Sequence, residues 1–170
     1  MLTSIVVDTS YWLELFKIPK HYKEVHYLEI KKRFAEAAQN KSLLYNPIPV
    51  LFELANHIAH VDNGDVRRYL SQTFSETVKL GISNTDILFN IIPCMAFSVA
   101  SELNESLDFF VSRFEAEFST QGLGFTDSSI ILEAESLKTT ENRVHIWTLD
   151  EVLKAREPDT ESYPFTGNIK

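Results

Sequence analysis

The stretch Ile5-Val6-Val7-Asp8-Thr9-Ser10 decides the predicted fold, because it joins three consecutive β-branched residues to an aspartate. A short, continuous apolar run of this kind predicts a strand that is buried on both faces, as in a parallel sheet. The polar residues that follow can cap a short helix over residues 11–16, which Pro19 ends. Asp8 therefore either caps this helix or lies at the carboxyl end of a strand, where parallel sheets bind their ligands.

The remainder of the chain alternates between strand-like and helix-like segments. Further strands are predicted at 42–45, 77–82 and 144–148, and helices at 23–39, 48–61, 65–74, 84–102, 107–118 and 126–138. This alternation predicts an α/β fold, a three-layer sandwich with a mostly parallel central sheet flanked by helices. The length of 170 residues suits a single domain spanning 1–170, with the tail after about residue 158 at its periphery.

Composition excludes several classes of protein. The chain has 16 basic and 24 acidic residues and a net charge of −8, which argues against binding nucleic acid or membranes through a broad basic surface. The single cysteine, Cys94, excludes an internal disulfide or a cysteine-rich zinc module, and its apolar setting predicts a buried thiol. Neither a secretory signal nor a membrane-spanning run is evident, so we expect a cytoplasmic protein.

Four of the acidic residues occupy positions that are harder to dismiss as solvated surface. Asp8 and Asp150 follow predicted strands, Asp127 opens a helix on its apolar side, and Glu53 borders the apolar stripe of helix 48–61. Each has a structural alternative: a helix cap for Asp8 or Asp127, a boundary residue for Glu53, and a turn residue for Asp150. If these carboxylates converge, they require a cation, and Mg²⁺ or Mn²⁺ prefers such oxygen ligands.

Four stretches carry a resemblance to a known family: Ile5–Ser10, Pro49–Ala55, Phe125–Ile131 and Trp147–Asp150. In this order, spread over nearly the whole chain, they resemble the PIN-domain family of metal-dependent nucleases, and within it the VapC-type toxins. The resemblance implies a PIN-like fold that hydrolyses RNA phosphodiester bonds through water activated by Mg²⁺ or Mn²⁺. It assigns catalytic and metal-binding roles to Asp8, Glu53, Asp127 and Asp150, with Ser10 and Thr148 supporting them by hydrogen bonds.

The same resemblance implies partners, and the chain also departs from the family pattern. A toxin requires an antitoxin protein that silences it, and self-association as a dimer is common in the family. The chain exceeds a minimal VapC-type toxin within about 84–122, has Ser128-Ser129 where small residues such as Ala are common, and lacks an aromatic residue after Asp150. The alternatives are a non-catalytic PIN-like module that binds RNA or a protein, and a nuclease directed at DNA.

A basic segment supplies candidate substrate contacts. Residues 17–33 hold six of the 16 basic residues and two acidic ones, a net charge of +4 (six minus two), interleaved with histidine and tyrosine. Lys17, Lys20 and Lys23 could therefore contact the RNA backbone, although a solvated helix face with pairs such as Glu29–Arg33 explains the pattern equally simply.

Two histidines share the predicted helix of Glu53. His57 and His60 lie within about a quarter turn of Glu53 on that helix. They could contact phosphate or be ordinary boundary residues. A zinc site is the weakest interpretation, because the spacing is not that of a His-Glu-x-x-His metalloprotease.

Overall fold

The computed structural model describes residues 3–83, 89–90 and 103–168, and these form an α/β sandwich. Its sheet contains β1 (Ser4–Val7), β2 (Leu43–Tyr45), β3 (Phe89–Asn90) and β4 (Val144–Trp147) in the order β3-β2-β1-β4. All neighbouring strands are parallel, and Ser4 of β1 aligns with Leu43 on one side and with Val144 on the other. The predicted α/β class with a parallel central sheet is therefore confirmed.

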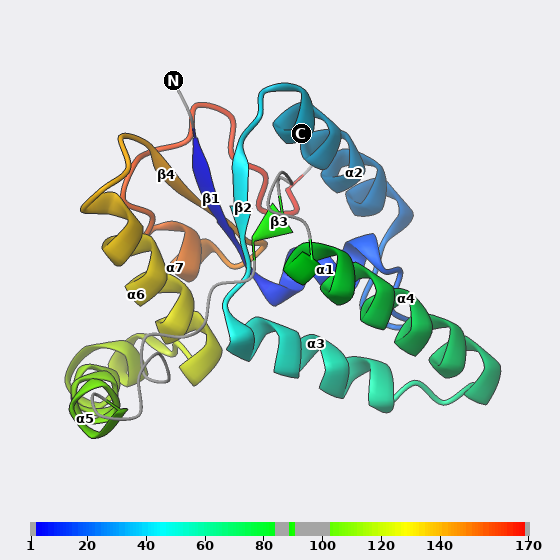
Figure 1. The fold of residues 1–170 in the computed structure, drawn as a ribbon, viewed down its shortest axis with the longest axis horizontal. Helices are drawn as coiled ribbons and strands as arrows, with labels where there is room; N and C mark the ends of the chain where they lie inside the picture. Colours follow the sequence, from blue (N-terminus) through cyan, green and yellow to red (C-terminus); the bar gives the residue numbers. More distant parts are fainter. Residues whose placement is uncertain (1–2, 84–88, 91–102, 169–170) are drawn as a thin grey trace.

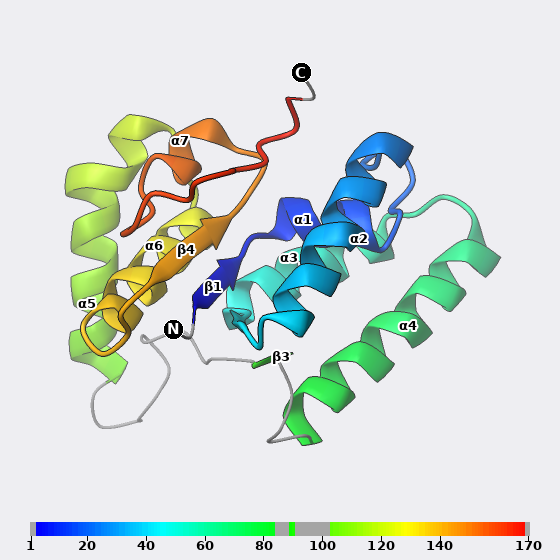
Figure 2. The same ribbon diagram turned by 90° about the horizontal axis from the view of Figure 1, so that it is seen from above.

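Helices lie on both sides of this sheet (Figure 1). Three helices lie on one side of β1 and β4, namely α5 (Leu103–Arg113), α6 (Phe125–Lys138) and α7 (Glu151–Lys154) (Figure 2). The other side is covered by α1 (Thr9–Leu15), α2 (Glu24–Gln39), α3 (Ile48–Ala59) and α4 (Gly64–Ser83). Because helices cover both faces, every residue of β1 and β4 is buried, including the polar Ser4 and His145. None of the described helices is long and apolar enough to cross a membrane.

The predicted helix at 65–74 is present as the first part of α4, which continues to Ser83. The strand predicted at 77–82 was therefore wrong, because those residues belong to the same helix. Thr77 and Val78 favoured a strand, but β propensity is a weak preference that tertiary contacts override. In α4 the Thr77 hydroxyl donates to the carbonyl of Thr73, 2.8 Å away, so a helix satisfies this polar group. Leu70 is buried against the core and anchors the helix there.

The middle of the chain is described only in part. The predicted helix at 84–102 and Cys94 lie outside the described residues, except for Phe89–Asn90, which form β3 instead of a helix. The predicted helix at 107–118 is present as α5 and a π-helical segment, Phe114–Phe118. Phe110 and Phe118 are buried, as their spacing predicted, whereas Leu107 and Val111 are 40% and 43% exposed.

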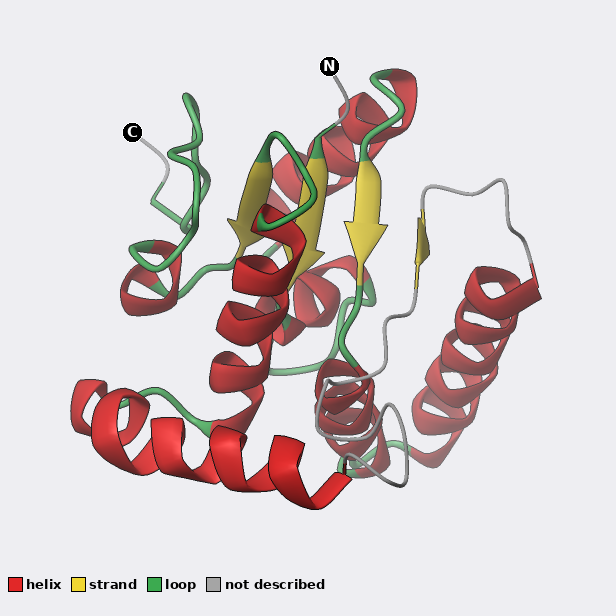
Figure 3. Ribbon diagram, turned by 60° about the vertical axis from the view of Figure 1, so that its left-hand side comes forward, coloured by secondary structure: helices red, strands yellow, loops and turns green. Residues whose placement is uncertain are grey.

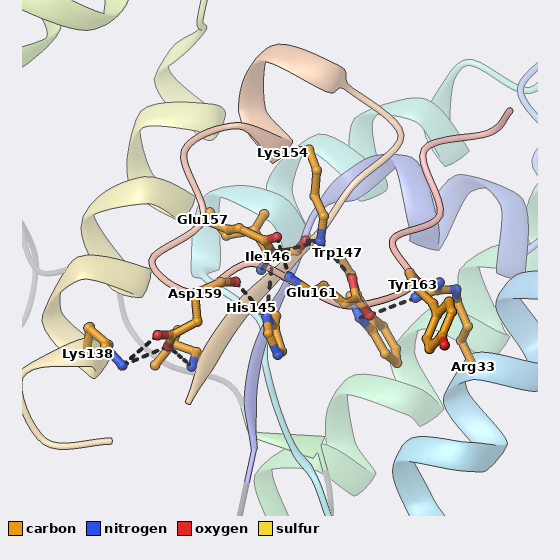
Figure 4. Close-up of polar contacts among 11 residues, drawn as sticks. Arg33, Lys138, His145, Ile146, Trp147, Lys154, Glu157, Asp159, Glu161 and Tyr163 are labelled. Atoms are coloured by element: carbon orange, nitrogen blue, oxygen red, sulfur yellow. Dashed lines mark hydrogen bonds and ion pairs between the residues drawn. The ribbon is translucent and has the colours of Figure 1, made fainter. Parts of the chain in front are cut away.

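The C-terminal tail belongs to the packed structure, contrary to the prediction that residues after about 158 are peripheral. Phe165 is part of the core, and the Tyr11 hydroxyl donates to its carbonyl oxygen at 2.8 Å. A buried ion network also fixes the tail (Figure 4): Glu161 accepts hydrogen bonds from Arg33 at 3.0 Å and from Lys154 at 2.7 Å. Arg33 lies 128 residues away from Glu161, so no local pattern could have revealed this pair.

Replacing Glu161 with Gln should lower the free energy of unfolding by about 2 kcal/mol, because Arg33 and Lys154 would lose a buried carboxylate partner. Urea denaturation at neutral pH measures this change. Glu76→Gln is the matched control, since Glu76 is exposed and no ion pair is recorded for it among the described residues. Equal stability of the two variants would contradict the structural role of Glu161.

Replacing Lys41 with Gly should raise the free energy of unfolding by about 1 kcal/mol. Lys41 follows the end of α2 with a φ of 55°, a left-handed conformation that costs a side-chain-bearing residue free energy and costs glycine little. The next residue closes the helix end, since the Ser42 amide donates to the carbonyl of Ala37 at 2.9 Å. Urea denaturation measures the change, and an unchanged or lower stability would contradict this prediction.

Candidate active site

Asp8 is fixed at the carboxyl end of β1, between two segments of the chain. Its amide donates to the carbonyl of Trp147 at 2.9 Å, which continues the pairing of β1 with β4. Its Oδ2 accepts hydrogen bonds from the Ser10 hydroxyl at 2.5 Å and the Thr148 hydroxyl at 2.9 Å, and from the Ser10 amide at 3.2 Å. The two interpretations of Asp8 from the sequence are thus compatible: it caps α1 and also lies at the edge where parallel strands end.

Ser10 and Thr148 extend this arrangement to the segment after β4. The Ser10 hydroxyl accepts from the Leu149 amide at 2.9 Å, and the Thr148 hydroxyl accepts from the Asp150 amide at 3.0 Å. Both hydroxyls therefore hold the Asp8 carboxylate and at the same time position the backbone that leads to Asp150. In Figure 3 the strand arrowheads all point towards this edge of the sheet.

The other three acidic residues reach the site from three different helices. Glu53 on α3 accepts a hydrogen bond from the Thr9 hydroxyl at 2.7 Å. Asp127 lies in the first turn of α6, where its Oδ2 accepts from the Gly124 amide at 2.7 Å. Asp150 caps α7, and its Oδ1 accepts from the amides of the second and third residues after it. Each carboxylate is therefore positioned by a local hydrogen bond.

Only one oxygen of each carboxylate is used in this way. Among the described residues, no hydrogen bond is made to the second oxygen of any of the four, namely Oδ1 of Asp8, Oε1 of Glu53, Oδ1 of Asp127 and Oδ2 of Asp150. Within the same described ranges, no Lys, Arg or His forms an ion pair with any of them. The protein thus orients four carboxylates whose negative charge is not paired with a cation from the described part of the chain.

The charges of these carboxylates act on one another. Burial, together with the negative charges of Asp8, Asp150 and Glu53, raises the pKa of Asp127 to about 6, although the hydrogen bond from the Gly124 amide opposes this shift. Burial also raises the pKa of Asp8, although the hydrogen bonds from Ser10 and Thr148 oppose this effect. The four acidic residues predicted from the sequence are therefore within electrostatic reach at one edge of the sheet.

The arrangement suits a hard divalent cation by the chemistry of its donors, but it is not a preassembled cage. In the part of the chain that the structure describes, no three His, Cys, Asp or Glu side chains are placed to hold one metal ion together. Simultaneous ligation by all four acids is therefore absent from this arrangement. Mg²⁺ commonly binds through one or two carboxylates and keeps several waters, so the available oxygens fit such an ion.

The lysines predicted to contact substrate interact with acidic residues outside the four carboxylates of the candidate site. Lys17 pairs with Glu24 at 3.0 Å, and Lys20 pairs with Asp62 at 2.6 Å. Lys23 is exposed, and its amide donates to a carboxylate oxygen of Glu14 at 2.7 Å. These contacts favour the interpretation of a solvated face with surface ion pairs, which contribute little to stability and can exchange for a ligand.

His57 on α3 interacts electrostatically with Glu53. The rings of His57 and His21 are 4.6 Å apart, edge to face. Burial lowers the pKa of His57 and the neighbouring His21 lowers it further, while the charge of Glu53 opposes this shift. His57 is therefore within electrostatic reach of Glu53. His60 instead hydrogen-bonds the carbonyl of Asn56 at 2.7 Å, which leaves the zinc hypothesis without support among the described residues.

Sequence reasoning missed Thr9 as a functional residue. Thr9 is buried and its hydroxyl orients Glu53, which lies 44 positions later in the chain. The sequence indicated only that Thr9, like Asp8 and Ser10, could cap α1. No spacing rule connects a residue in the first turn of one helix with a distant helix, so the pairing required the fold.

Comparison with known proteins gives no family: a scan against family models finds no match to this chain, and a search of curated proteins finds no relative. The resemblance to PIN-domain nucleases therefore depends on the four sequence stretches alone.

Replacing Asp127 with Asn should stabilise the metal-free protein at pH 7 by about 1 kcal/mol, after allowance for partial exposure of the group. Because the folded-state pKa of Asp127 is about 6, against 3.8 ordinarily, the wild-type protein loses stability as pH rises through 6 and this carboxyl ionises. The Asn variant does not ionise at this position and therefore keeps its stability as the pH rises. Urea denaturation in EDTA at pH 5 and pH 7 measures the free energy of unfolding of both proteins.

The control is Asp108→Asn, which removes an exposed carboxylate of α5 that lies outside the cluster. This variant should have the same pH dependence of stability as the wild-type protein. If Asp127→Asn also shows the wild-type dependence, the four carboxylates do not interact as described.

Proposed function

We propose that this protein is a metal-dependent endoribonuclease that hydrolyses RNA phosphodiester bonds with Mg²⁺ or Mn²⁺. The observation that carries the proposal is the set of four oriented carboxylates, each with one available oxygen and none paired with a cation from the described residues. Carboxylates held together in this way are stabilised by a bound cation. The PIN-like sequence stretches, which contain these four acidic residues, support the same conclusion.

Each residue of the site has a role in this proposal. A bound divalent ion would lower the pKa of water and neutralise charge on the phosphate oxygens. Asp8 and Asp127 are the central candidates for holding it, with Glu53 and Asp150 beside them. Ser10 and Thr148 hold Asp8 in one orientation, and Thr9 does the same for Glu53, so these hydroxyls pre-organise the carboxylates. Lys17, Lys20, Lys23 and His57 remain candidates for contacts with the RNA.

The biological setting rests on the family resemblance alone. On that basis we propose that the protein acts in the cytoplasm as the toxin of a toxin–antitoxin pair, that an antitoxin protein silences it, and that it forms a dimer. The proposed nuclease activity does not depend on these partners.

A second candidate function is a non-catalytic PIN-like module that binds RNA or a protein. The observation that favours it is that no three His, Cys, Asp or Glu side chains among the described residues form a metal site. Calorimetric titration with Mn²⁺ distinguishes the two functions. The nuclease should bind Mn²⁺ and lose this binding in Asp8→Asn, whereas the non-catalytic module should bind no Mn²⁺ at the four carboxylates.

Replacing Asp8 with Asn should reduce RNA cleavage by roughly 100-fold or more while the protein remains folded. Asn keeps an oxygen that accepts from Ser10 and Thr148, so the change removes charge with little loss of packing. The measurement is cleavage of a panel of RNA and single-stranded DNA with Mg²⁺, Mn²⁺ or EDTA, with Asp108→Asn as the control. Wild-type cleavage that survives EDTA, or a fully active Asp8→Asn variant, would refute the proposal.

A further inference from the structure

The C-terminal segment 165–168 is held against α1 and α2 by two backbone carbonyl groups. The Phe165 carbonyl accepts a hydrogen bond from the Tyr11 hydroxyl of α1 at 2.8 Å. The Gly167 carbonyl oxygen lies 3.1 Å from Nε2 of His26 on α2. The same segment packs on the His26 ring, since the centroid of the Phe165 ring is 5.6 Å away and a Cβ on Gly167 would lie 3.3 Å from the ring carbon Cε1. His26 is therefore a main contact of this segment.

Both ring nitrogens of His26 face an oxygen atom. The side chain is buried, with Nδ1 2.7 Å from Oε1 of Glu14 on α1 and Nε2 3.1 Å from the Gly167 carbonyl. An ionised carboxylate and a carbonyl group only accept hydrogen bonds, so both nitrogens must carry hydrogen for both bonds to form. The arrangement therefore requires the protonated, positively charged ring.

The carboxylate of Glu14 determines which bond a neutral ring would keep. Glu14 is also buried, its Oε2 accepts from the Lys23 amide at 2.7 Å, and among the described residues its ion pair is with His26. A buried carboxylate without a hydrogen-bonded partner is costly, and a carboxylate accepts more strongly than a carbonyl group. A neutral ring therefore keeps its hydrogen on Nδ1, and the lone pair of Nε2 then faces the lone pairs of the Gly167 oxygen.

The other ionisable groups around His26 in the described structure keep their charge state near neutral pH. Besides the carboxylate, α1 contributes Tyr11, whose pKa burial raises well above its ordinary value. On α2, Lys23 and Glu29 lie one turn before and one turn after His26, and Glu29 pairs with Arg33 at 3.5 Å. Such side chains stay charged between pH 5.5 and 8.5. The segment 165–168 contributes a carbonyl oxygen and an apolar ring, so histidine protonation is the event that changes this contact.

We propose that His26 is a proton-controlled latch for the C-terminal segment: the protonated ring holds Gly167, and the neutral ring releases it. The held segment binds one proton more than the released segment. Its attachment therefore weakens as the pH rises through the range in which histidine titrates. This inference is independent of the proposed nuclease function.

Release of the segment would also reach α7. The side-chain amide of Asn168 donates from Nδ2 to Oε1 of Glu151 at 2.9 Å, and Glu151 directly follows Asp150, the residue that caps α7. When the latch opens, the first turn of α7 loses this contact. The latch thus connects the charge of one buried histidine with a helix on the other side of the sheet.

Solution NMR of the isotopically labelled full chain between pH 5.5 and 8.5 tests the inference. The ¹³C shift of the Gly167 carbonyl reports its hydrogen bond, the heteronuclear NOE of the Asn168 amide reports order in the segment, and the Cε1–H shift of His26 reports protonation. We expect all three to change with one midpoint. The ratio of held to released segment should fall roughly 10-fold or more as the pH rises, the effect of losing one hydrogen bond from a charged donor.

Variants separate the latch from other effects of pH. His26→Gln cannot titrate, so the Gly167 carbonyl shift should become independent of pH. His60→Gln is the matched control, because His60 is exposed and hydrogen-bonds within its own helix region, and it should leave the titration unchanged. Gly167→Ala keeps the buried pair with Glu14 but should favour release at every pH, since the φ of Gly167 is 84° and the added Cβ would crowd the ring.

Two results would overturn the inference. One is a Gly167 carbonyl shift that stays constant while the His26 ring titrates, and the other is a ring that keeps a single protonation state from pH 5.5 to 8.5. Both are measured on the wild-type protein, so they decide the matter even if His26→Gln fails to fold.

Discussion

The Asp8 carboxylate organises this protein, because one buried oxygen joins the neighbouring strands β1 and β4 to the helices that follow them. Oδ2 accepts hydrogen bonds from Ser10 after β1 and from Thr148 after β4, and these hydroxyls in turn accept from the backbone that leads to Asp150. A buried carboxylate is costly unless hydrogen bonds satisfy it. The polar residues after both strands meet that requirement, and they thereby fix where the next carboxylate lies.

Charged side chains are paired around the C-terminal tail but not at the carboxyl edge of the sheet. Around the tail, the buried Arg33 and Lys154 are matched by Glu157 and Glu161, so each charge has a partner (Figure 4). At the carboxyl edge of the sheet, by contrast, four carboxylates are oriented without a cation from the described residues. Such unpaired negative charge reduces the stability of the folded state. The divalent ion that we propose would offset this charge, and the contrast with the paired charges at the tail supports a functional site at this edge.

The net charge of −8 is not offset by an open basic surface to which a nucleic acid could bind. The basic segment 17–33 does not form an open cationic surface, because Lys17 and Lys20 pair with acidic neighbours and Arg33 is buried. The RNA substrate that we propose would therefore depend on the bound metal more than on a basic surface, whose binding of nucleic acid weakens steeply with salt concentration.

The sequence by itself determined β1, β2, β4, most of the helices and the four acidic positions, because strand runs, helix caps and periodicity are local properties of the chain. The local pattern predicted a strand within α4, where tertiary packing outweighs the β propensity of Thr77 and Val78. It also predicted a peripheral tail, although Phe165 is part of the core. Only the tertiary structure decided that Thr9 orients Glu53, that Glu161 joins Arg33 to Lys154, and that the four carboxylates lack a cation among the described residues. These facts depend on contacts between residues far apart in the chain, where no spacing rule applies.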